Sequence, residues 1–364
     1  MTSGAADLTN IAALRDNKAR GAIDALTSLR FFAAAAVLLF HSGSHVLVAG
    51  GYIPWPVQNI IRNGYLGVSF FFVLSGFILT YVYQGAMSKA GSLGRFYAAR
   101  FARVYPVYAL SILLMAPITP DVIGLDTLPQ FFLLQMWLPL KDGYFQNWNG
   151  PCWTLSVELL FYLTFPIWLS LFNRLSTRQI GYAAIALSII LIAGRLSGIS
   201  DTVNVTSTAL SQFPVPFLRL PEFVFGICLG LLLLREGHSA EAPWAPHFCI
   251  ALTAVVLAAS QSLWVAPFAT ISFGALIFST AAWLRAGLLE RFLSSRIMVL
   301  LGGASYSLYL LQSPAREWLR VLAAGSWETA ARIAYQPMLV VLSIFVFLWF
   351  EEPARRWLKL RART

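Results

Sequence analysis

The chain has 364 residues, of which 58% are hydrophobic and only 12% are charged. A soluble domain carries about twice that share of charged residues, so the composition excludes an ordinary soluble protein. The charges gather in short stretches between apolar runs that are long enough to cross ~30 Å of hydrocarbon. The net charge of +10 therefore does not indicate a nucleic-acid partner, and we expect the lipid bilayer to surround this chain.

The apolar runs predict an all-α polytopic membrane protein with about ten transmembrane helices. We expect three parts: a short N-terminal tail over 1–28 without a cleavable signal peptide, a membrane domain over 29–350, and a basic C-terminal tail over 351–364. The run 128–140 is too short to cross and predicts an interfacial or re-entrant segment. The expected spans lie near 29–48, 65–83, 104–119, 153–172, 179–195, 215–234, 247–261, 264–284, 299–319 and 335–350.

Basic residues predict the orientation of these spans. With a cytoplasmic N-terminus, 18 of the 26 Lys and Arg residues fall on the inner side and 6 on the outer side. Such an excess is typical of cytoplasmic loops. An even number of spans also requires both termini to share a side. We therefore expect both tails in the cytoplasm.

Five ionisable residues lie inside the predicted spans, where charges are costly and usually functional or paired. Counting from the predicted ends places His41 and Glu158 in the outer half of the membrane and Arg30 at its cytoplasmic side. Their common depth makes His41 the expected partner of Glu158. The full set is Arg30, His41, Glu158, Arg219 and Glu222.

Arg30 and His41 are eleven residues apart, almost three helical turns, so both project from one helix face about 16 Å apart along the axis. They would then line a single conduit. Alternatively, Arg30 is a snorkelling anchor and His41 a packed histidine of the bundle. Arg219 and Glu222, three residues apart, form a simple intrahelical ion pair in the less specific interpretation.

No metal site is expected. His45 follows His41 by four residues, but no third ligand or HExxH pattern accompanies the pair. The three cysteines are too few and too scattered for a disulfide framework.

A basic segment, GSLGRFYAARFARVYPVY, interleaves arginines with aromatic residues in a predicted cytoplasmic loop. Positive-inside bias explains most such loops. The alternative is a docking site for an anionic cytoplasmic ligand, because guanidinium groups bind phosphates well. Its arginines are Arg95, Arg100 and Arg103.

Several segments together resemble the acyltransferase-3 family of membrane O-acyltransferases. They occur in family order from residue 29 to 357, and this order makes the resemblance highly specific, although no single motif is strong. LRFFAAAAVLLFH contains the Arg-x10-His element of the family. The others are GYLGVSFFFVLSGFILTY, RFARVYPVY, CWTLSVELLFY, LRLPEFVFGICLG, and the closing GGASYSLYLLQSP and FEEPARRW.

The resemblance implies transfer of an acyl group, usually acetyl from acetyl-CoA as a co-substrate, to a sugar hydroxyl. Arg30, Arg100 and Arg103 are then expected to bind the donor phosphates. His41 would be the general base near neutral pH, with Glu158 orienting its imidazole; an acyl-histidine intermediate is the alternative. The expected acceptor-binding residues are Arg219, Glu222, Trp153 and Tyr162.

The sequence departs from the family pattern in two places, and it leaves two alternative functions open. The family often has His where this chain has Gln312, and the appended SGNH-type domain of some members is not expected here. A transporter of an anionic solute would use the same intramembrane charges, whereas an MBOAT-type acyltransferase is disfavoured by the motif order. We expect a bacterial inner-membrane enzyme whose acceptor is a lipid-linked saccharide of an exopolysaccharide.

Overall fold

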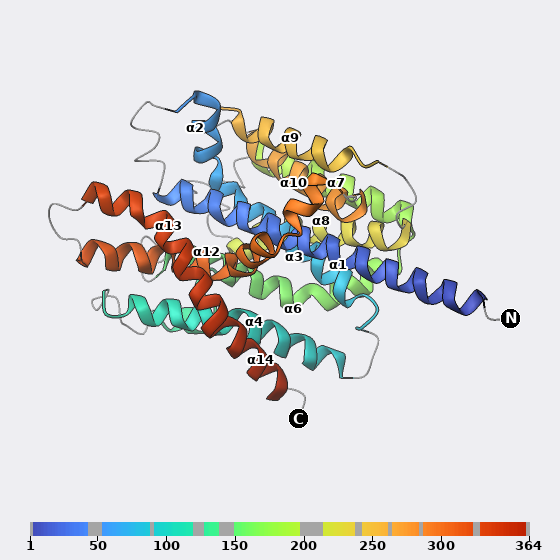
Figure 1. The fold of residues 1–364 in the computed structure, drawn as a ribbon, viewed down its shortest axis with the longest axis horizontal. Coiled ribbons are helices and arrows are strands. Elements are labelled where there is room, and N and C mark those ends of the chain that lie inside the picture. Colours follow the sequence, from blue (N-terminus) through green and yellow to red (C-terminus); the bar gives the residue numbers. More distant parts are fainter. Residues whose placement is uncertain are drawn as a thin grey trace.

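A computed structural model describes residues 3–42, 53–87, 91–118, 127–137, 149–196, 214–236, 242–260, 264–283, 287–322 and 328–361. Nearly all of the described residues are helical, and none of them lies in a strand. The long helices run side by side as a bundle (Figure 1). The predicted all-α polytopic class is confirmed.

In the part of the chain that the structure describes, eight helices are long and apolar enough to cross a membrane. They are α1 (Ser3–Leu38, with its candidate span over Gly21–Ser42), α3 (Gly67–Tyr83), α4 (Ser92–Met115), α6 (Trp153–Asn173), α7 (Thr177–Leu196), α8 (Val215–Glu236), α10 (Val265–Trp283), and α13 (Glu328–Val346) continued by α14 (Glu352–Arg361).

The other two predicted spans correspond to α9 (Ala245–Ala258) and α12 (Arg296–Leu322). The apolar helix α9 has only 14 residues. Conversely, α12 has 27 residues but carries several polar and charged side chains. Three short helices complete the described fold: α2 (Trp55–Arg62), α5 (Leu128–Phe131) and α11 (Leu288–Leu293).

Helices continue through three segments that hydropathy assigns to tails or loops. The first helix begins at Ser3, and its candidate span covers Gly21–Ser42. Arg30 therefore lies near the middle of this span rather than at its end. The predicted basic loop is the first half of α4, and the predicted C-terminal tail is α14.

Glycines bring the backbones of α3 and α8 into close contact. A Cβ atom at Gly76 would overlap the Phe223 carbonyl, and one at Gly226 would overlap the Val73 carbonyl. Small residues at helix interfaces permit such packing in membranes. The crossing fixes the polar residues of α8 beside those of α3.

A second close contact joins α1 to α12. A Cβ atom at Gly302 would overlap the Thr27 carbonyl, and the Ser28 hydroxyl donates to the Leu293 carbonyl just before α12. These contacts hold Arg30, one turn further along α1, against the centre of the bundle.

The predicted re-entrant run 128–140 is described up to residue 137, and it does not form a spanning helix. Its backbone folds around the start of α6. Ser156 donates to the Leu133 carbonyl at 2.7 Å and accepts the Met136 N–H at 3.2 Å. Gln135 donates to the Cys152 carbonyl at 3.0 Å. The first turns of α6 are thus covered by non-helical chain.

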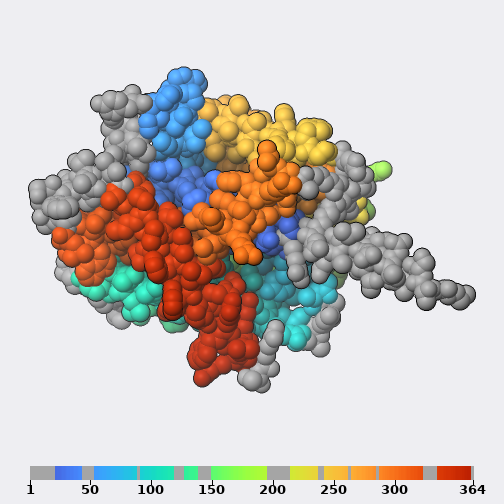
Figure 2. All heavy atoms as spheres, viewed as in Figure 1, coloured from blue at the N-terminus to red at the C-terminus, as the bar shows by residue number. Residues whose placement is uncertain are grey.

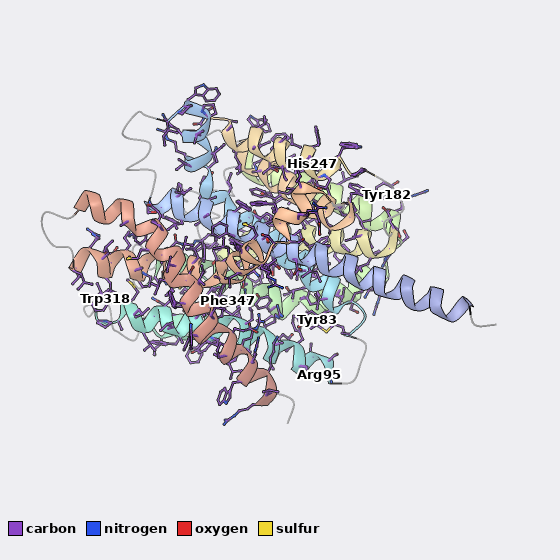
Figure 3. All side chains as sticks on the ribbon, viewed as in Figure 1. Tyr83, Arg95, Tyr182, His247, Trp318 and Phe347 are labelled. Carbon is purple, nitrogen blue, oxygen red and sulfur yellow. The ribbon has the colours of Figure 1, made fainter. Side chains whose placement is uncertain are left out.

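The two ends of the bundle differ. Tyr83 and Arg95 lie together at one end, whereas Trp318 lies at the other (Figure 3). Trp318 donates from its indole to the Leu114 carbonyl at 2.8 Å, which ties the ends of α12 and α4 together. The space-filling view shows α13 and α14 as one red ridge across the viewed face (Figure 2).

Candidate active site

A cavity of about 110 Å³ lies among α1, α3, α4, α6 and α12. Three of its lining residues are arginines from α1 and α4, and one is a glutamate from α6. The lining is Arg30, Phe71, Leu74, Ser75, Ile78, Leu79, Arg100, Arg103, Val104, Glu158, Tyr162 and Tyr306. Five residues predicted for the site, Arg30, Arg100, Arg103, Glu158 and Tyr162, therefore share this cavity.

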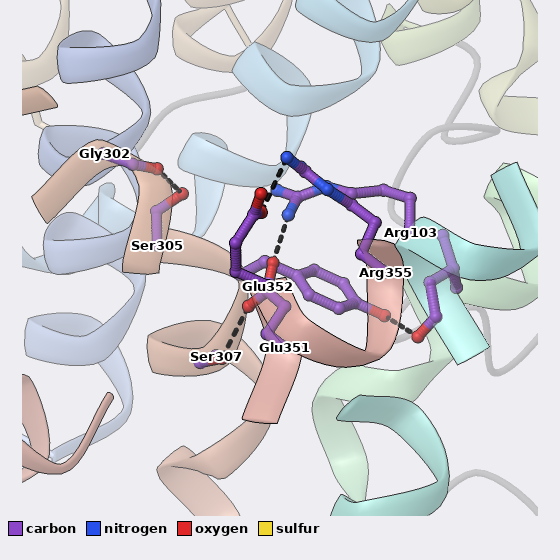
Figure 4. A network of polar contacts seen from close by, with 9 residues as sticks. Arg103, Gly302, Ser305, Ser307, Glu351, Glu352 and Arg355 are labelled. Atoms are coloured by element: carbon purple, nitrogen blue, oxygen red, sulfur yellow. Dashed lines mark hydrogen bonds and ion pairs between the residues drawn. The ribbon is translucent and has the colours of Figure 1, made fainter. Parts of the chain in front are cut away.

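Arg103 forms a buried ion pair with Glu351, the last residue of the π-helical turn Phe347–Glu351 between α13 and α14 (Figure 4). Glu351 also accepts the Ser307 hydroxyl at 2.7 Å. The Arg103 guanidinium lies over the Tyr306 ring, 5.2 Å from its centroid. An arginine with a carboxylate and an aromatic face is a stable arrangement away from water. The pair ties the end of α13 to α4.

Arg100, one turn before Arg103, has a different environment. Its guanidinium donates to the Tyr83 hydroxyl at 3.3 Å and lies 5.5 Å from the Tyr83 ring centroid and 5.9 Å from that of Tyr162. Its Nε is buried without a hydrogen-bond partner among the described residues. A buried unpaired donor is costly, so this nitrogen is available to a ligand.

Glu158 lies in the second turn of α6. Its Oε2 accepts the Tyr162 hydroxyl at 2.7 Å. Arg30, Arg100 and Arg103 all lie within electrostatic reach of its carboxylate. Arg30 in turn is close to Arg103, Glu351 and Glu158.

The charges around the cavity do not cancel. Three guanidinium groups face Glu158 inside the cavity, and Glu351 stands directly behind Arg103. These groups leave a positive excess in a site of low dielectric, where charge interactions are strong. The cavity is therefore suited to an anionic ligand.

His41 does not reach this site, and the predicted pairing of His41 with Glu158 is absent from the structure. His41 lies in a π-helical turn over 39–42 at the end of the first span. Its side chain is exposed, its ring lies 5.0 Å from that of Phe40, and its charged neighbour is Arg316.

The depth estimate failed for a physical reason. Residues 128–137 cover the first turns of α6, and the first span begins at Gly21, so that Arg30 lies near its middle rather than at its end. Glu158 consequently lies level with Arg30. His41 stands about 16 Å further along α1, at 1.5 Å rise per residue.

A second polar cluster lies on α8. Arg219 pairs with Glu222 at 3.2 Å and donates to the Ser69 hydroxyl at 3.1 Å. Its guanidinium lies 5.2 Å from the Phe72 ring centroid and 5.9 Å from that of Trp153. The intrahelical ion pair is thus present, and it brings Trp153 to the same cluster. Tyr162, by contrast, lies in the arginine cavity.

Gln312 occupies the position at which the family often has His. Its side-chain amide donates to the Tyr309 carbonyl at 2.8 Å, and its Oε1 is buried without a described partner. The Tyr335 hydroxyl donates to its backbone carbonyl. The amide thus bonds a backbone carbonyl, and it has no group that gains or loses a proton near neutral pH. Within the described residues no group of three His, Cys, Asp or Glu side chains is placed to hold a metal; His45 lies outside them.

Several members of the site were not predicted from the sequence. Ser75, Tyr306 and Ser307 stand inside motifs that were noted only as family elements. Glu351 could have been predicted from the sequence, because Glu351 and Glu352 are the two acidic residues of an otherwise basic C-terminal segment. A carboxylate at that position predicts a buried cationic partner.

The fold and the site together define a polytopic helical membrane protein with an internal, positively charged cavity. Residues 23–352 match the family described as "Acyltransferase domain". The chain belongs to this acyltransferase-3 family. The match confirms the prediction of a membrane O-acyltransferase.

Two curated relatives are informative. The chain is 29% identical to Acyltransferase MdmB of Streptomyces mycarofaciens, with 88% of each chain covered. It is 24% identical to O-acetyltransferase OatA of Staphylococcus aureus over 79% of its own length. The chain spans about half the length of that second protein, 50%. No solved structure gives a significant match.

Proposed function

We propose that this acyltransferase transfers an acetyl group from acetyl-CoA to a hydroxyl of a saccharide. The observation that carries the proposal is the convergence of Arg30, Arg100 and Arg103 on one cavity with a positive excess. Guanidinium groups bind phosphates through charge-assisted hydrogen bonds. The donor phosphates would enter beside Arg100 and Arg103, and Arg30 would hold the deeper part of the donor.

The acetyl group then has to reach an acceptor. The slender pantetheine arm would extend along α1 from the cavity toward His41, a spacing of about 16 Å. His41 would take the proton of the acceptor hydroxyl as its oxygen attacks the thioester carbonyl. The C–S bond breaks, and the proton passes to the departing thiolate.

Glu158 has a different role in this proposal from the one expected. Its carboxylate accepts from Tyr162 and faces the arginines. It would hold Arg30 and Arg100 in position for the donor rather than orient the imidazole. His41 therefore works without this carboxylate.

The acceptor would lie near the second cluster. Trp153 offers an aromatic face, and Arg219, Glu222 and Ser69 offer polar groups beside it. The saccharide class is supported by a relative in Listeria monocytogenes named Peptidoglycan O-acetyltransferase OatA, which is 26% identical over 50% of this chain. We propose a lipid-linked exopolysaccharide unit at a bacterial inner membrane, with both termini cytoplasmic.

The test uses purified full-length protein in lipid nanodiscs with acetyl-CoA labelled in the acetyl group. The expected result is transfer of label to a saccharide acceptor with release of free CoA thiol. Acetyl content of surface glycans from cells with and without the gene identifies the natural acceptor. The proposal is overturned if the protein releases no CoA thiol and the glycans of the two kinds of cell have the same acetyl content. Transport of an anionic solute would then be the function to test.

A further inference from the structure

The C-terminal helix α14 (Glu352–Arg361) packs along α4, the helix that supplies Arg100 and Arg103 to the cavity. It carries one carboxylate at its start and four basic residues: Arg355, Arg356, Lys359 and Arg361. In the space-filling view α14 lies uncovered on the viewed face (Figure 2). Its basic residues are thus accessible beside the arginine cavity.

Lys359 is an exposed side chain that lies within electrostatic reach of Arg355, Arg100 and Arg103. The only carboxylate among its strongest electrostatic neighbours is Glu352. Like charges at short range repel one another unless an anion lies between them. The cationic group therefore continues from the cavity out onto α14.

Glu352 holds one side of this group in place. Its carboxylate pairs with Arg355 at 2.6 Å and with Arg356 at 2.9 Å (the first contact is drawn in Figure 4). Glu352, Arg355 and Lys359 follow one another at helical spacings of three and four, so they share a face of α14. That face meets α4. An anion at this face would contact the Arg355 guanidinium, which Glu352 holds in place, and the flexible Lys359 ammonium group.

The cavity arginines alone do not suit a whole nucleotide. Arg30 and Arg103 lie near the middle of their helices, and Arg103 is already paired with Glu351. Acyl-CoA carries a diphosphate and a further phosphate on its ribose. A donor of this kind needs cations near the helix ends as well as inside the bundle.

We propose that Arg355 and Lys359 of α14 form an outer subsite for the nucleotide phosphates of the acyl-CoA donor. The subsite rests on the proposed function, because it assumes that acyl-CoA is the donor. Arg100 then binds the donor deeper, where its buried Nε has no described partner. The headgroup of an anionic lipid has the same chemistry, so the test must separate the two sources.

The experiment measures acetyl transfer by full-length protein in nanodiscs of phosphatidylcholine alone and, in a second arm, in nanodiscs that also contain phosphatidylglycerol. Three donors are compared: acetyl-CoA, 3′-dephospho-acetyl-CoA and acetyl-pantetheine, which has no nucleotide phosphate. Lys359→Gln and Arg355→Gln are the test variants. Arg361→Gln is the matched control, because it also removes one positive charge from α14. The Arg361 guanidinium lies against the Trp357 ring, 4.2 Å from its centroid, and is not part of the proposed subsite.

We expect Lys359→Gln to raise the KM for acetyl-CoA about tenfold, as the loss of one charge-assisted phosphate contact predicts. The kcat stays unchanged, and so does the KM for acetyl-pantetheine. Arg361→Gln leaves all three donors unaffected. A smaller effect with the 3′-dephospho donor than with acetyl-CoA assigns the ribose phosphate to Lys359, and equal effects assign the diphosphate.

Three results overturn the subsite. One is an unchanged KM for acetyl-CoA in both test variants. Another is an equal loss with acetyl-pantetheine, which makes the residues structural. The third is an effect that appears only in nanodiscs containing phosphatidylglycerol, which assigns the residues to lipid. If wild-type protein uses neither acetyl-CoA nor acetyl-pantetheine, the proposed function itself fails, and that outcome is visible before any variant is made.

Discussion

Arg103 and Glu351 are 248 residues apart in the chain, yet they form a buried ion pair between α4 and the end of α13. The pair places an arginine at the wall of the cavity and at the same time fixes the start of α14. Its loss would therefore affect both stability and donor binding.

Glu351→Gln should destabilise the protein strongly. Removing one partner of a buried pair leaves an uncompensated charge, at a cost of about 3–5 kcal/mol. The measurement is thermal or denaturant unfolding of purified protein in detergent. The adjacent Glu352→Gln serves as control, because its partners Arg355 and Arg356 are more exposed and such pairs contribute only about 0.2–1 kcal/mol. Equal effects of the two substitutions would contradict the buried pair.

Gly76→Ala should disrupt the crossing of α3 and α8. The added Cβ would overlap the Phe223 carbonyl, and overpacking costs about 1–3 kcal/mol or more. The control is Gly181→Ala in α7, where nothing lies within 4 Å of the added atom. That change should be neutral or stabilise by up to about 1 kcal/mol. Comparable unfolding temperatures for the two variants would show that α3 and α8 do not meet as described.

Arg30→Ala should weaken acyl-CoA binding. One charge-assisted contact is worth about 1.5–3 kcal/mol, which corresponds to a tenfold or greater rise in Kd. The measurement is titration calorimetry or competition with a labelled CoA analogue. Arg95→Ala is the control, because Arg95 is exposed in the first turn of the neighbouring α4. If both variants bind the donor as wild type does, Arg30 is a structural residue only.

His41→Ala should abolish transfer and leave donor binding intact. The reason is spatial: His41 lies outside the arginine cavity, so its removal does not change the phosphate contacts. Loss of a general base lowers kcat by about 10²–10⁴-fold. A His41→Ala protein that inserts normally and keeps near-native transfer would exclude His41 as base or nucleophile.

Glu158→Gln should show the opposite pattern. The neutral amide no longer attracts Arg30 and Arg100, so the KM for acetyl-CoA should rise more than kcat falls. Comparing KM and kcat in the two variants separates the proposed roles. Identical kinetic changes in His41→Ala and Glu158→Gln would restore the abandoned pairing of these residues.

Reporter fusions test the orientation. The basic count predicts that fusions after residues 95, 291 and 361 report a cytoplasmic location. The structure is compatible with this placement, since Tyr83 and Arg95 lie at the end of the bundle opposite Trp318 (Figure 3). A reporter at the C-terminus that is active only outside the cytoplasm would overturn the orientation.

The sequence was sufficient for the class of the protein. Apolar runs of about 20 residues have few fates other than membrane spans, because each backbone polar group in lipid must be satisfied within a helix. The order of weak motifs was sufficient for the family. The sequence also indicated five of the cavity residues. Arg30 and Glu158 stood out as charges inside apolar spans, where charges are rarely without function. Arg100 and Arg103 came from the basic segment, and Tyr162 from the family resemblance.

The tertiary structure decided which of these residues meet. Hydropathy places a helix end where apolar residues stop, and it cannot detect that residues 128–137 cover the start of α6 or that α4 begins twelve residues before its predicted span. The covered start of α6, together with a first span that begins at Gly21, brings Glu158 to Arg30 and away from His41. The partnership of Arg103 with Glu351 was equally invisible, because it joins residues from opposite halves of the chain. Depth in a membrane is set by how helices pack against one another, and packing is a property of the whole bundle rather than of any one segment.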